Sequence, residues 1–306
     1  MSNATLEKPI TDYYPSRIED EPQLLDRHDP VVHGNMPGPL STEQLRDYEE
    51  NGFLSFHALF SLEELQPYID ELERLKKSEA GSDSPRTITE PGSGNVRSIF
   101  AIEEHNAVLR QICHHPRLVG IARQLLGSEV YIHQSRINFK PGFKGKEFYW
   151  HSDFETWHVE DGLPRMRTVS CSLALTPNTP NNGPLMLIPG SHQKFLSCVG
   201  KTPEDNYKTS LKMQDIGVPD DESLAGMARE GGIVAPTGPA GSVTFFECNT
   251  MHGSNSNITP DPRSNIFMVF NSVENTLVDP FCGLKPRPDF IAKRGDVEAI
   301  PYKPEA

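Results

Sequence analysis

The tripeptide His151-Ser152-Asp153, inside the aromatic run Phe148–His158, is the feature that most constrains how this chain can fold. On a β-strand, residues i and i+2 point to the same face, so the imidazole and the carboxylate can both reach one metal ion. A third ligand must come from a distant segment, and His252 is the best candidate. Two histidines and one carboxylate, with other positions left open, form the facial triad of non-haem Fe(II) sites. The pattern therefore predicts a barrel in which an early and a late strand meet at a metal.

Predicted helices gather early in the chain and short strands gather late. Capping boxes at Ser41–Gln44 and Ser61–Glu64 predict helices that end at Asn51 and near Lys77. A third helix covers residues 117–126 and stops at Gly127, and residues 79–95 are predicted to form a loop. Short runs rich in β-branched and aromatic residues predict strands at residues 53–56, 130–139, 167–175, 184–188, 241–246 and 265–270. This order predicts a mainly β fold with flanking helices, a double-sheet jelly roll or barrel under an N-terminal helical cover.

The domain organisation follows from where these patterns begin and where they are interrupted. Residues 1–40 are rich in Pro, Asp and His, and they are predicted to form an arm that is either mobile or laid over the surface. Residues 41–306 show no internal repeat and are predicted to form a single domain. A long polar insert at about 191–235, with a short helix at 222–229, interrupts the strands and is a candidate lid.

Charge and composition exclude several classes of protein. A net charge of −13 argues against a general nucleic-acid binder, because phosphate backbones require clustered Lys and Arg. No stretch approaches the roughly 18 apolar residues of a membrane span, and the N-terminus lacks the pattern of a secretory signal. The five cysteines are widely spaced and form no CxxC pair, so neither a disulfide framework nor a structural zinc site is predicted. The chain is predicted to be cytoplasmic and reduced.

One further residue supports the metal site, and several alternatives stay open. Arg263 follows His252 by eleven positions, just before a strong strand, where its guanidinium suits a carboxylate of a co-substrate. His192 is a rival third ligand, although a structural role suits it better, and His158 is either a group around the metal or an exposed polar residue. The pair at positions 151 and 153 also has a metal-free interpretation as hydrogen-bonded neighbours. On a regular strand, Phe148 and Trp150 face away from the metal.

The run from Phe148 to Arg167 resembles the signature of the ectoine hydroxylases, in the phytanoyl-CoA dioxygenase-like branch of Fe(II)/2-oxoglutarate oxygenases. The wider branch is also suggested by Leu125-Leu126-Gly127, by Pro189–His192 and by His252-Gly253, and the resemblance spans roughly residues 40–290. It implies a cupin-like, double-stranded β-helix core. It also implies hydroxylation of ectoine to 5-hydroxyectoine, a step of compatible-solute biosynthesis, in which 2-oxoglutarate and O2 become succinate and CO2. A dimer is implied as well.

The resemblance also implies roles for individual residues. The iron ligands would be His151, Asp153 and His252. Arg263 would bind the distal carboxylate of 2-oxoglutarate, in a pocket lined by Ser170, Asn138 and Phe148. That role for Phe148 opposes the strand parity described above, and a bulge or a twist of the strand would remove the conflict. The positions implied for ectoine are Gln134, Thr156, Trp157, Phe270 and Arg287.

The chemistry of these residue types is consistent with the implied ligands. An indole such as Trp157 can hold the cationic ring of ectoine by a cation–π contact, and Arg287 can hold its carboxylate. Three alternatives remain: a related oxygenase that hydroxylates another small amino acid such as proline, a non-catalytic metal-binding barrel, and a zinc hydrolase.

Overall fold

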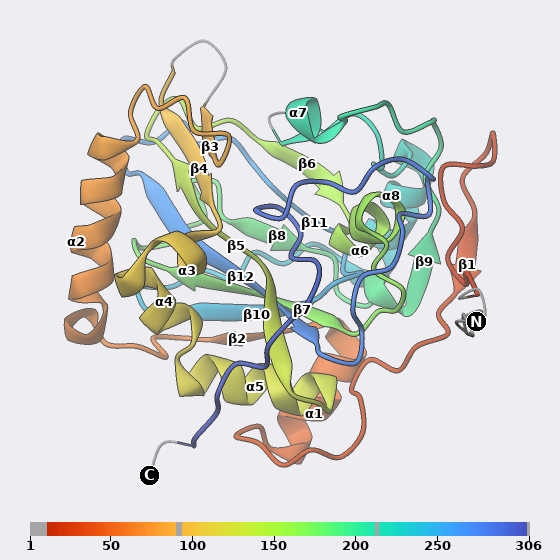
Figure 1. The fold of residues 1–306 in the computed structure, drawn as a ribbon, viewed down its shortest axis with the longest axis horizontal. Coiled ribbons are helices and arrows are strands. Elements are labelled where there is room, and N and C mark those ends of the chain that lie inside the picture. The colour runs from red at the N-terminus through yellow and green to blue at the C-terminus, as the bar shows by residue number, and fades with distance from the viewer. Residues whose placement is uncertain (1–10, 90–93, 212–213, 305–306) are drawn as a thin grey trace, which may run out of the picture.

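A computed structural model describes residues 11–89, 94–211 and 214–304, and two antiparallel sheets dominate it (Figure 1). Residues 1–10 of the predicted arm and 90–93 of the predicted loop lie outside the described residues. The strands of the seven-stranded sheet are, in hydrogen-bonding order, β2 (Phe53–Phe56), β10 (Val243–Glu247), β7 (Thr168–Ala174), β12 (Arg263–Ser272), β5 (Val130–Lys140), β4 (Val96–Phe100) and β3 (Thr87–Thr89). Those of the three-stranded sheet are β6 (Phe148–His151), β11 (His252–Ser254) and β8 (Leu185–Leu187).

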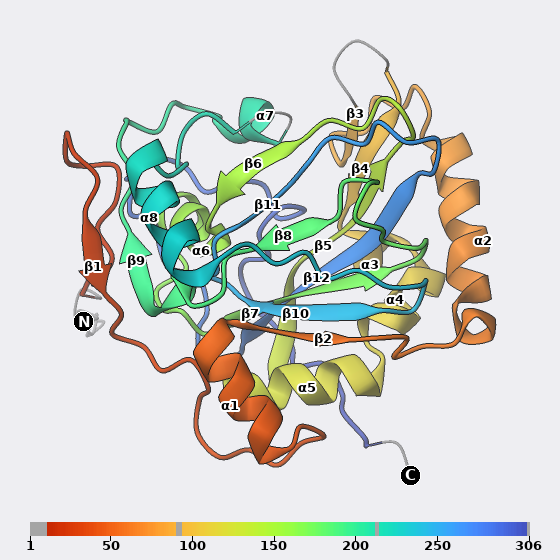
Figure 2. The same ribbon diagram turned by 180° about the vertical axis from the view of Figure 1, so that it is seen from behind.

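The two sheets pack face to face, and helices cover the other face of the large sheet (Figure 2). Leu185 and Leu187 of the small sheet share a buried cluster with Phe246 and Phe267 of the large one. On the opposite face, α5 (Pro116–Leu126) contacts β5, β7 and β12. The other helices of this cover are α1 (Thr42–Asn51), α2 (Leu62–Ser78), α3 (Ile102–His105) and α4 (Ala107–Cys113). The prediction of a mainly β fold with an N-terminal helical cover is therefore confirmed.

Local sequence signals account for the helix ends. The hydroxyls of Ser41 and Ser61 each accept a hydrogen bond from the backbone three residues on, and the side chains of Gln44 and Glu64 complete both capping boxes. Helix α5 ends at Gly127, whose φ of +59° is the left-handed conformation that favours glycine. A Cβ at this glycine would lie 1.9 Å from the carbonyl oxygen of His33. The predicted strands are also present, although the short strand β3 falls within the predicted loop.

The described part of the N-terminal arm, residues 11–40, lies over the surface of the domain (Figure 1). Its strand β1 (Leu24–Asp26) pairs with β9 (Lys194–Leu196) in a two-stranded sheet. Tyr14 is completely buried and Arg17 is 8% exposed, so these two side chains fix the arm to the domain. Of the two alternatives for this segment, the structure has the one in which the arm is laid over the domain.

The long insert and the segment that follows β6 supply the remaining helices. The insert contains η2 (Ser191–Gln193), α7 (Tyr207–Ser210) and α8 (Asp221–Gly231), so the short helix expected at 222–229 is present. Residues 212–213 of the insert lie outside the described residues. After β6 the chain forms α6 (Asp153–Thr156) and then the π-helix η1 (Trp157–Asp161). π-Helical turns are rare in proteins, and those that occur often lie at functional sites.

Candidate metal centre and co-substrate pocket

The three predicted ligands meet at the end of the small sheet. One ligand atom from each of His151, Asp153 and His252 lies within 4.8 Å of the others. The Nε2 atoms of the two histidines are 3.6 Å and 3.7 Å from the carboxylate oxygens of Asp153. The two histidines are cross-strand neighbours in the register of β6 and β11, which explains how ligands 101 positions apart come together.

The route by which Asp153 reaches the site differs from the prediction. We expected the histidine and the carboxylate to share one face of a strand, but β6 ends at His151. Ser152 caps α6, and Asp153 is the first residue of that helix. The turn from strand to helix, rather than the two-residue period of a strand, therefore brings the carboxylate beside the imidazole.

Hydrogen bonds orient all three ligands. The Nδ1 atom of His151 lies 2.8 Å from the carbonyl oxygen of Tyr149, and that of His252 lies 2.9 Å from the carbonyl oxygen of Thr250. Each Nδ1–H therefore donates to the backbone, which leaves Nε2 with its lone pair toward the site. The hydroxyl of Ser170 donates to Asp153 at 3.2 Å and holds the carboxylate in place.

Electrostatics prepare the same groups for a cation. Burial and the neighbouring His151 lower the pKa of His252 to about 4, so its imidazole is neutral at neutral pH. Burial alone would raise the pKa of Asp153, but His252, His151 and Arg136 outweigh it and lower that pKa below its ordinary value. The site therefore presents the neutral imidazole of His252 and the ionised carboxylate of Asp153 at neutral pH, and with the imidazole of His151 this donor set suits a divalent metal ion such as Fe(II).

A bulge in β6 settles the position of Phe148. The partner of His252 is His151, whereas the partner of Ser254 is Phe148, so β6 carries one extra residue between these two pairs. The extra residue reverses the parity of the strand, and the ring of Phe148 lies 4.8 Å from that of His151. The expectation from a regular strand was wrong for Phe148. Trp150 does face away, against Ile188, Leu196 and Met251.

A pocket opens beside the two histidines and contains most of the positions predicted for 2-oxoglutarate. Asn138, Phe148 and Arg263 line it together with His151 and His252. Ser170 supports the site from behind, through its bond to Asp153. The pocket has five cationic lining residues, and none of its described lining residues is acidic; the cations are Arg97, Arg136, Lys140, Lys146 and Arg263.

Arg263 is the most unusual of these cations. It is 5% exposed, and its Nε has no hydrogen-bond partner among the described residues. Burial lowers the pKa of its guanidinium to about 10. A buried cation without a counter-ion is costly, so this side chain is suited to an anionic ligand that enters the pocket.

The positions predicted for the substrate lie in a neighbouring region, around α6 and η1. Gln134 shares its strand face with Arg136 and Asn138, and its amide donates to the carbonyl oxygen of Ile291 at 2.7 Å. Thr156, at the end of α6, accepts a hydrogen bond from Gln214 of the insert. Trp157 is 3% exposed and packs edge-on against His133, with ring centroids 5.2 Å apart.

Arg287 joins this region from the C-terminal segment. Its Nε donates to Asp161 at 2.7 Å, and the two side chains form a buried ion pair. His133 lies 3.9 Å from the same carboxylate, and neither of its ring nitrogens has a hydrogen-bond partner among the described residues. Burial and the charge of Arg287 lower the pKa of His133 to about 3. No motif or spacing in the sequence marks this histidine as part of the site.

The structure does not bring Phe270 to the pocket. Its side chain is completely buried in the main core, with Ile266 and Met268 on the helix-covered face of β12. Phe267 lies on the same face of β12 as Arg263 and lines the pocket instead. Phe267 is four positions from Arg263 on one strand, so the two-residue period of a strand could have predicted that it faces the pocket. In the same way, Arg136 and Lys140 are each two positions from Asn138 on β5, which predicts that they also face the pocket.

His192, the rival third ligand, and His158, considered as a group around the metal, both have structural contacts instead. His192 is completely buried and bonds through Nε2 to the carbonyl oxygen of Glu49, outside the ligand cluster. His158 is also completely buried, stacks on Phe281 and bonds to Asp12, so the interpretation as an exposed residue was wrong. The histidine that joins His151 and Asp153 in the cluster is therefore His252.

Comparisons with known proteins agree with this geometry. A family model for phytanoyl-CoA dioxygenases matches residues 48–265. The chain is 56% identical over 294 residues to the ectoine dioxygenase of Bordetella bronchiseptica strain RB50, which covers 95% of this chain and 96% of that protein. It is 47% identical to EctD from S. alaskensis, crystallised with 2-oxoglutarate and 5-hydroxyectoine; the TM-score is 0.87, with 96% of this chain and 99% of that chain covered. The structure of the same protein with bound Fe gives a TM-score of 0.86 at 46% identity, with the same coverage.

Proposed function

The chain belongs to the phytanoyl-CoA dioxygenase family and, within it, to the ectoine dioxygenases, and we propose on this premise that it hydroxylates ectoine to 5-hydroxyectoine. The reaction consumes 2-oxoglutarate and O2 and releases succinate and CO2. The comparisons do not favour a proline hydroxylase, a non-catalytic barrel or a zinc hydrolase. The cofactor is Fe(II), and 2-oxoglutarate is the co-substrate.

His151, Asp153 and His252 would hold the iron. Their donor set fits the metal, because two oriented Nε2 lone pairs and one ionised carboxylate converge on one point. Bound Fe(II) would supply the oxidising chemistry that O2 and a 2-oxo acid make possible at an unactivated carbon. The protein contributes the face on which the ligands lie and leaves the other positions to co-substrate and O2.

The observation that carries the assignment of 2-oxoglutarate is the buried guanidinium of Arg263, whose Nε has no hydrogen-bond partner in the described part of the chain. It lines the same pocket as both metal-ligating histidines, so a dicarboxylate can reach the metal with one end and Arg263 with the other. A bidentate contact with a carboxylate would offset the cost of burying this cation. Asn138 and Phe148 would line the remainder of the co-substrate site, and Ser170 would act through Asp153.

Ectoine is proposed to bind beyond the metal, near α6 and η1. Trp157 offers an aromatic face to its cationic ring, and Gln134 and Thr156 offer polar groups. Arg287 would contact its carboxylate while remaining paired with Asp161. We assign the aromatic wall to Phe267 in place of Phe270, because Phe267 lines the pocket.

A direct assay tests this function. Purified protein is supplied with Fe(II), ascorbate, 2-oxoglutarate and either ectoine or proline, and succinate and the mass of the product are measured. We expect ectoine to stimulate succinate formation and to gain one oxygen. Stimulation by proline alone, or no oxygen gained by ectoine, would overturn the assignment of the substrate.

Four predictions about the whole protein remain proposals. They are an arm of residues 1–40 on a dioxygenase domain of 41–306, a lid at 191–235, a homodimer and a cytoplasmic location. The lid is supported by Leu211, which lines the pocket, and by Gln214, which bonds to Thr156. No helix in the described ranges is long and apolar enough to cross a bilayer. Light scattering during size-exclusion chromatography would test the dimer.

A further inference from the structure

We propose that the N-terminal arm positions the metal ligands, and that Arg27 is its principal positioning residue. The inference rests on the proposed iron site and adds a role for a segment more than 100 residues away from every ligand in the sequence. Arg27 follows β1, the strand that fixes the arm to the insert, and its side chain then turns inward.

Arg27 is anchored from several sides at once. Its Nη2 donates to the carboxylate of Glu247 at 3.0 Å, and the two side chains are 5% and 2% exposed. Its Nε donates to the carbonyl oxygen of Asp29 at 2.7 Å, and its Nη1 donates to that of His192 at 3.1 Å. Such a fork of fixed donors holds a carboxylate in one orientation, which a flexible lysine does not do.

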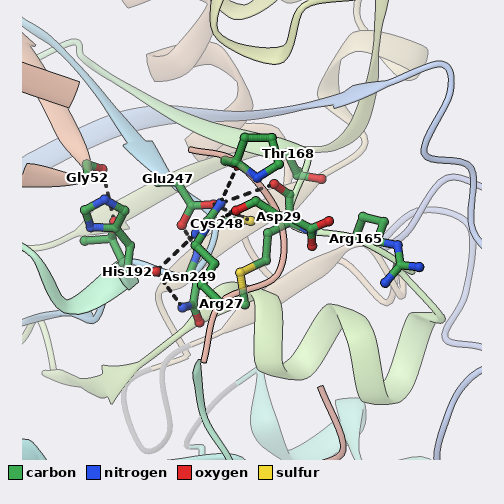
Figure 3. A network of polar contacts seen from close by, with 12 residues as sticks. Arg27, Asp29, Gly52, Arg165, Thr168, His192, Glu247, Cys248 and Asn249 are labelled. Carbon is green, nitrogen blue, oxygen red and sulfur yellow. Dashed lines mark hydrogen bonds and ion pairs between the residues drawn. The ribbon is translucent and has the colours of Figure 1, made fainter. Parts of the chain in front are cut away.

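The orientation of Glu247 is passed on through Asn249, which lies beside it together with Arg27 (Figure 3). Glu247 is the last residue of β10, and its second oxygen accepts the backbone N–H of Asn249 at 2.7 Å. The side chain of Asn249 donates to the carbonyl oxygens of His192 and Lys194, and its oxygen accepts the hydroxyl of Ser152 at 3.0 Å.

Ser152 lies between two of the ligands, and Asn249 lies three residues before the third. The same Ser152 caps the helix that begins with Asp153. A backbone bond of 2.8 Å from the N–H of Phe154 to the carbonyl oxygen of Cys248 ties the two ligand segments together next to this contact. The chain of contacts from Arg27 to Glu247, Asn249 and Ser152 therefore fixes both segments relative to each other.

A second buried arginine of the arm holds the far side of the same segment. Arg17 donates to Glu155 at 2.7 Å and 2.9 Å and to Glu160 at 2.7 Å. Its backbone has a φ of +61°, a conformation that a non-glycine residue keeps only when its surroundings enforce it. The arm thus contacts the residues on either side of the ligands without touching the metal position.

The test separates positioning from general stability. Replacing Arg27 alone would leave Glu247 buried and uncompensated, so the first variant is the neutral double substitution Arg27→Gln with Glu247→Gln. The second is Asn249→Ala, which removes the link to Ser152 without exposing a buried charge. The control is Asp26→Asn, which breaks the exposed ion pair between the arm and Lys194.

The measurements are the affinity of the full chain for Fe(II), by competition with a chelator, and the d–d absorption of the Co(II)-loaded protein; neither needs ectoine. We expect both variants to bind Fe(II) about tenfold or more weakly and to shift the Co(II) spectrum, since changes behind metal ligands typically cost 10–100-fold in affinity. Asp26→Asn should match the wild type. Affinity within twofold of the wild type in Asn249→Ala, with an unchanged spectrum, would overturn the inference even if the double variant does not fold.

The wild-type protein separates this failure from a failure of the proposed function. A wild type that binds neither Fe(II) nor Co(II) would refute the iron site itself. A wild type that binds both metals, with variants that bind them equally well, would refute only the role of the arm.

Discussion

The two sheets of this protein differ in size and in the parts of the site that they carry. The large sheet has strands of up to eleven residues and rests on the main core beneath the helices. The small sheet has strands of four, three and three residues, yet it carries His151 and His252, the two histidines proposed to bind the metal. Strands this short bury little surface among themselves, and the small sheet packs against Phe246 and Phe267 of the large one. The ligands therefore lie on the part of the fold that depends most on its neighbours.

The difference also separates the two ligands of the reaction. In the proposed site, the small sheet would present the histidines to the metal, whereas β5 and β12 of the large sheet would present Asn138 and Arg263 to the co-substrate. The pocket lies between the sheets and is lined by both. Substitutions in the small sheet should therefore weaken metal binding, whereas substitutions in the large sheet should weaken co-substrate binding.

The largest effect is expected on the small sheet, from His252→Ala. Loss of one of three ligands should remove Fe(II) binding, and the metal chemistry is worth several kcal/mol, so turnover should fall about a thousandfold or more. The metal-free protein should keep its circular dichroism spectrum, because the large sheet is untouched. His192→Gln is the control, since it alters a nearby buried histidine that is not a ligand. Loss of iron from the His192→Gln control as well would argue that His252 does not differ from other buried histidines nearby.

On the large sheet, Arg263→Gln should affect co-substrate binding instead. The variant should raise the KM for 2-oxoglutarate about a hundredfold, because removing one partner of a buried charge pair costs roughly 2–5 kcal/mol. Fe(II) affinity should stay near that of the wild type. Lys146→Gln, at the exposed rim of the same pocket, should change this KM less than about fivefold. Equal effects of the two substitutions would argue against Arg263 as the anchor.

The two faces of β12 should also separate stability from binding. Phe270→Leu removes a buried ring from the main core and should lower the free energy of unfolding by about 1–3 kcal/mol, with the KM values unchanged. Phe267→Leu should instead raise the KM for ectoine or 2-oxoglutarate, with a smaller change in stability. Urea unfolding and steady-state kinetics on both variants would check this pair. The opposite pattern would restore Phe270 to the site.

The smallest effect concerns pH and His133. The unfolded chain holds a proton on this imidazole below its ordinary pKa of 6.5, whereas the folded chain takes one only near pH 3. The unfolded state therefore binds more protons between these values, and stability falls by up to about 1.4 kcal/mol per unit as the pH falls. His133→Gln should reduce this slope by one proton in urea unfolding of the metal-free protein from pH 6.5 to 4.5. An unchanged slope would contradict the assignment.

Local signals in the sequence predicted much of the fold and the centre of the site. Capping boxes at Ser41 and Ser61, and a glycine stop at Gly127, act over a few residues, so they can be recognised without tertiary information. The triad was predictable because metal chemistry restricts the residue types. Family resemblance, rather than any physical pattern, narrowed the substrate to ectoine.

The features of the site that the sequence did not predict arise from irregular backbone and from long-range contacts. A bulge in β6 reversed the parity of Phe148, and the end of the strand at His151 altered the route to Asp153. No periodicity reports an inserted residue of this kind. The contact between Arg27 and Glu247 joins residues 220 positions apart, and only the folded structure shows it.

The pairing of His151 with His252 has a consequence for how the protein folds. If β11 slipped by one residue along β6, Met251 or Gly253 would lie opposite His151, and the ligand set would be lost. Short strands specify their register weakly by packing alone. A metal ion at the proposed site would therefore bind only to chains that have paired correctly, and it would shift the folding population toward that one alignment by mass action. Iron binding would in this way select the correct register of β6 and β11.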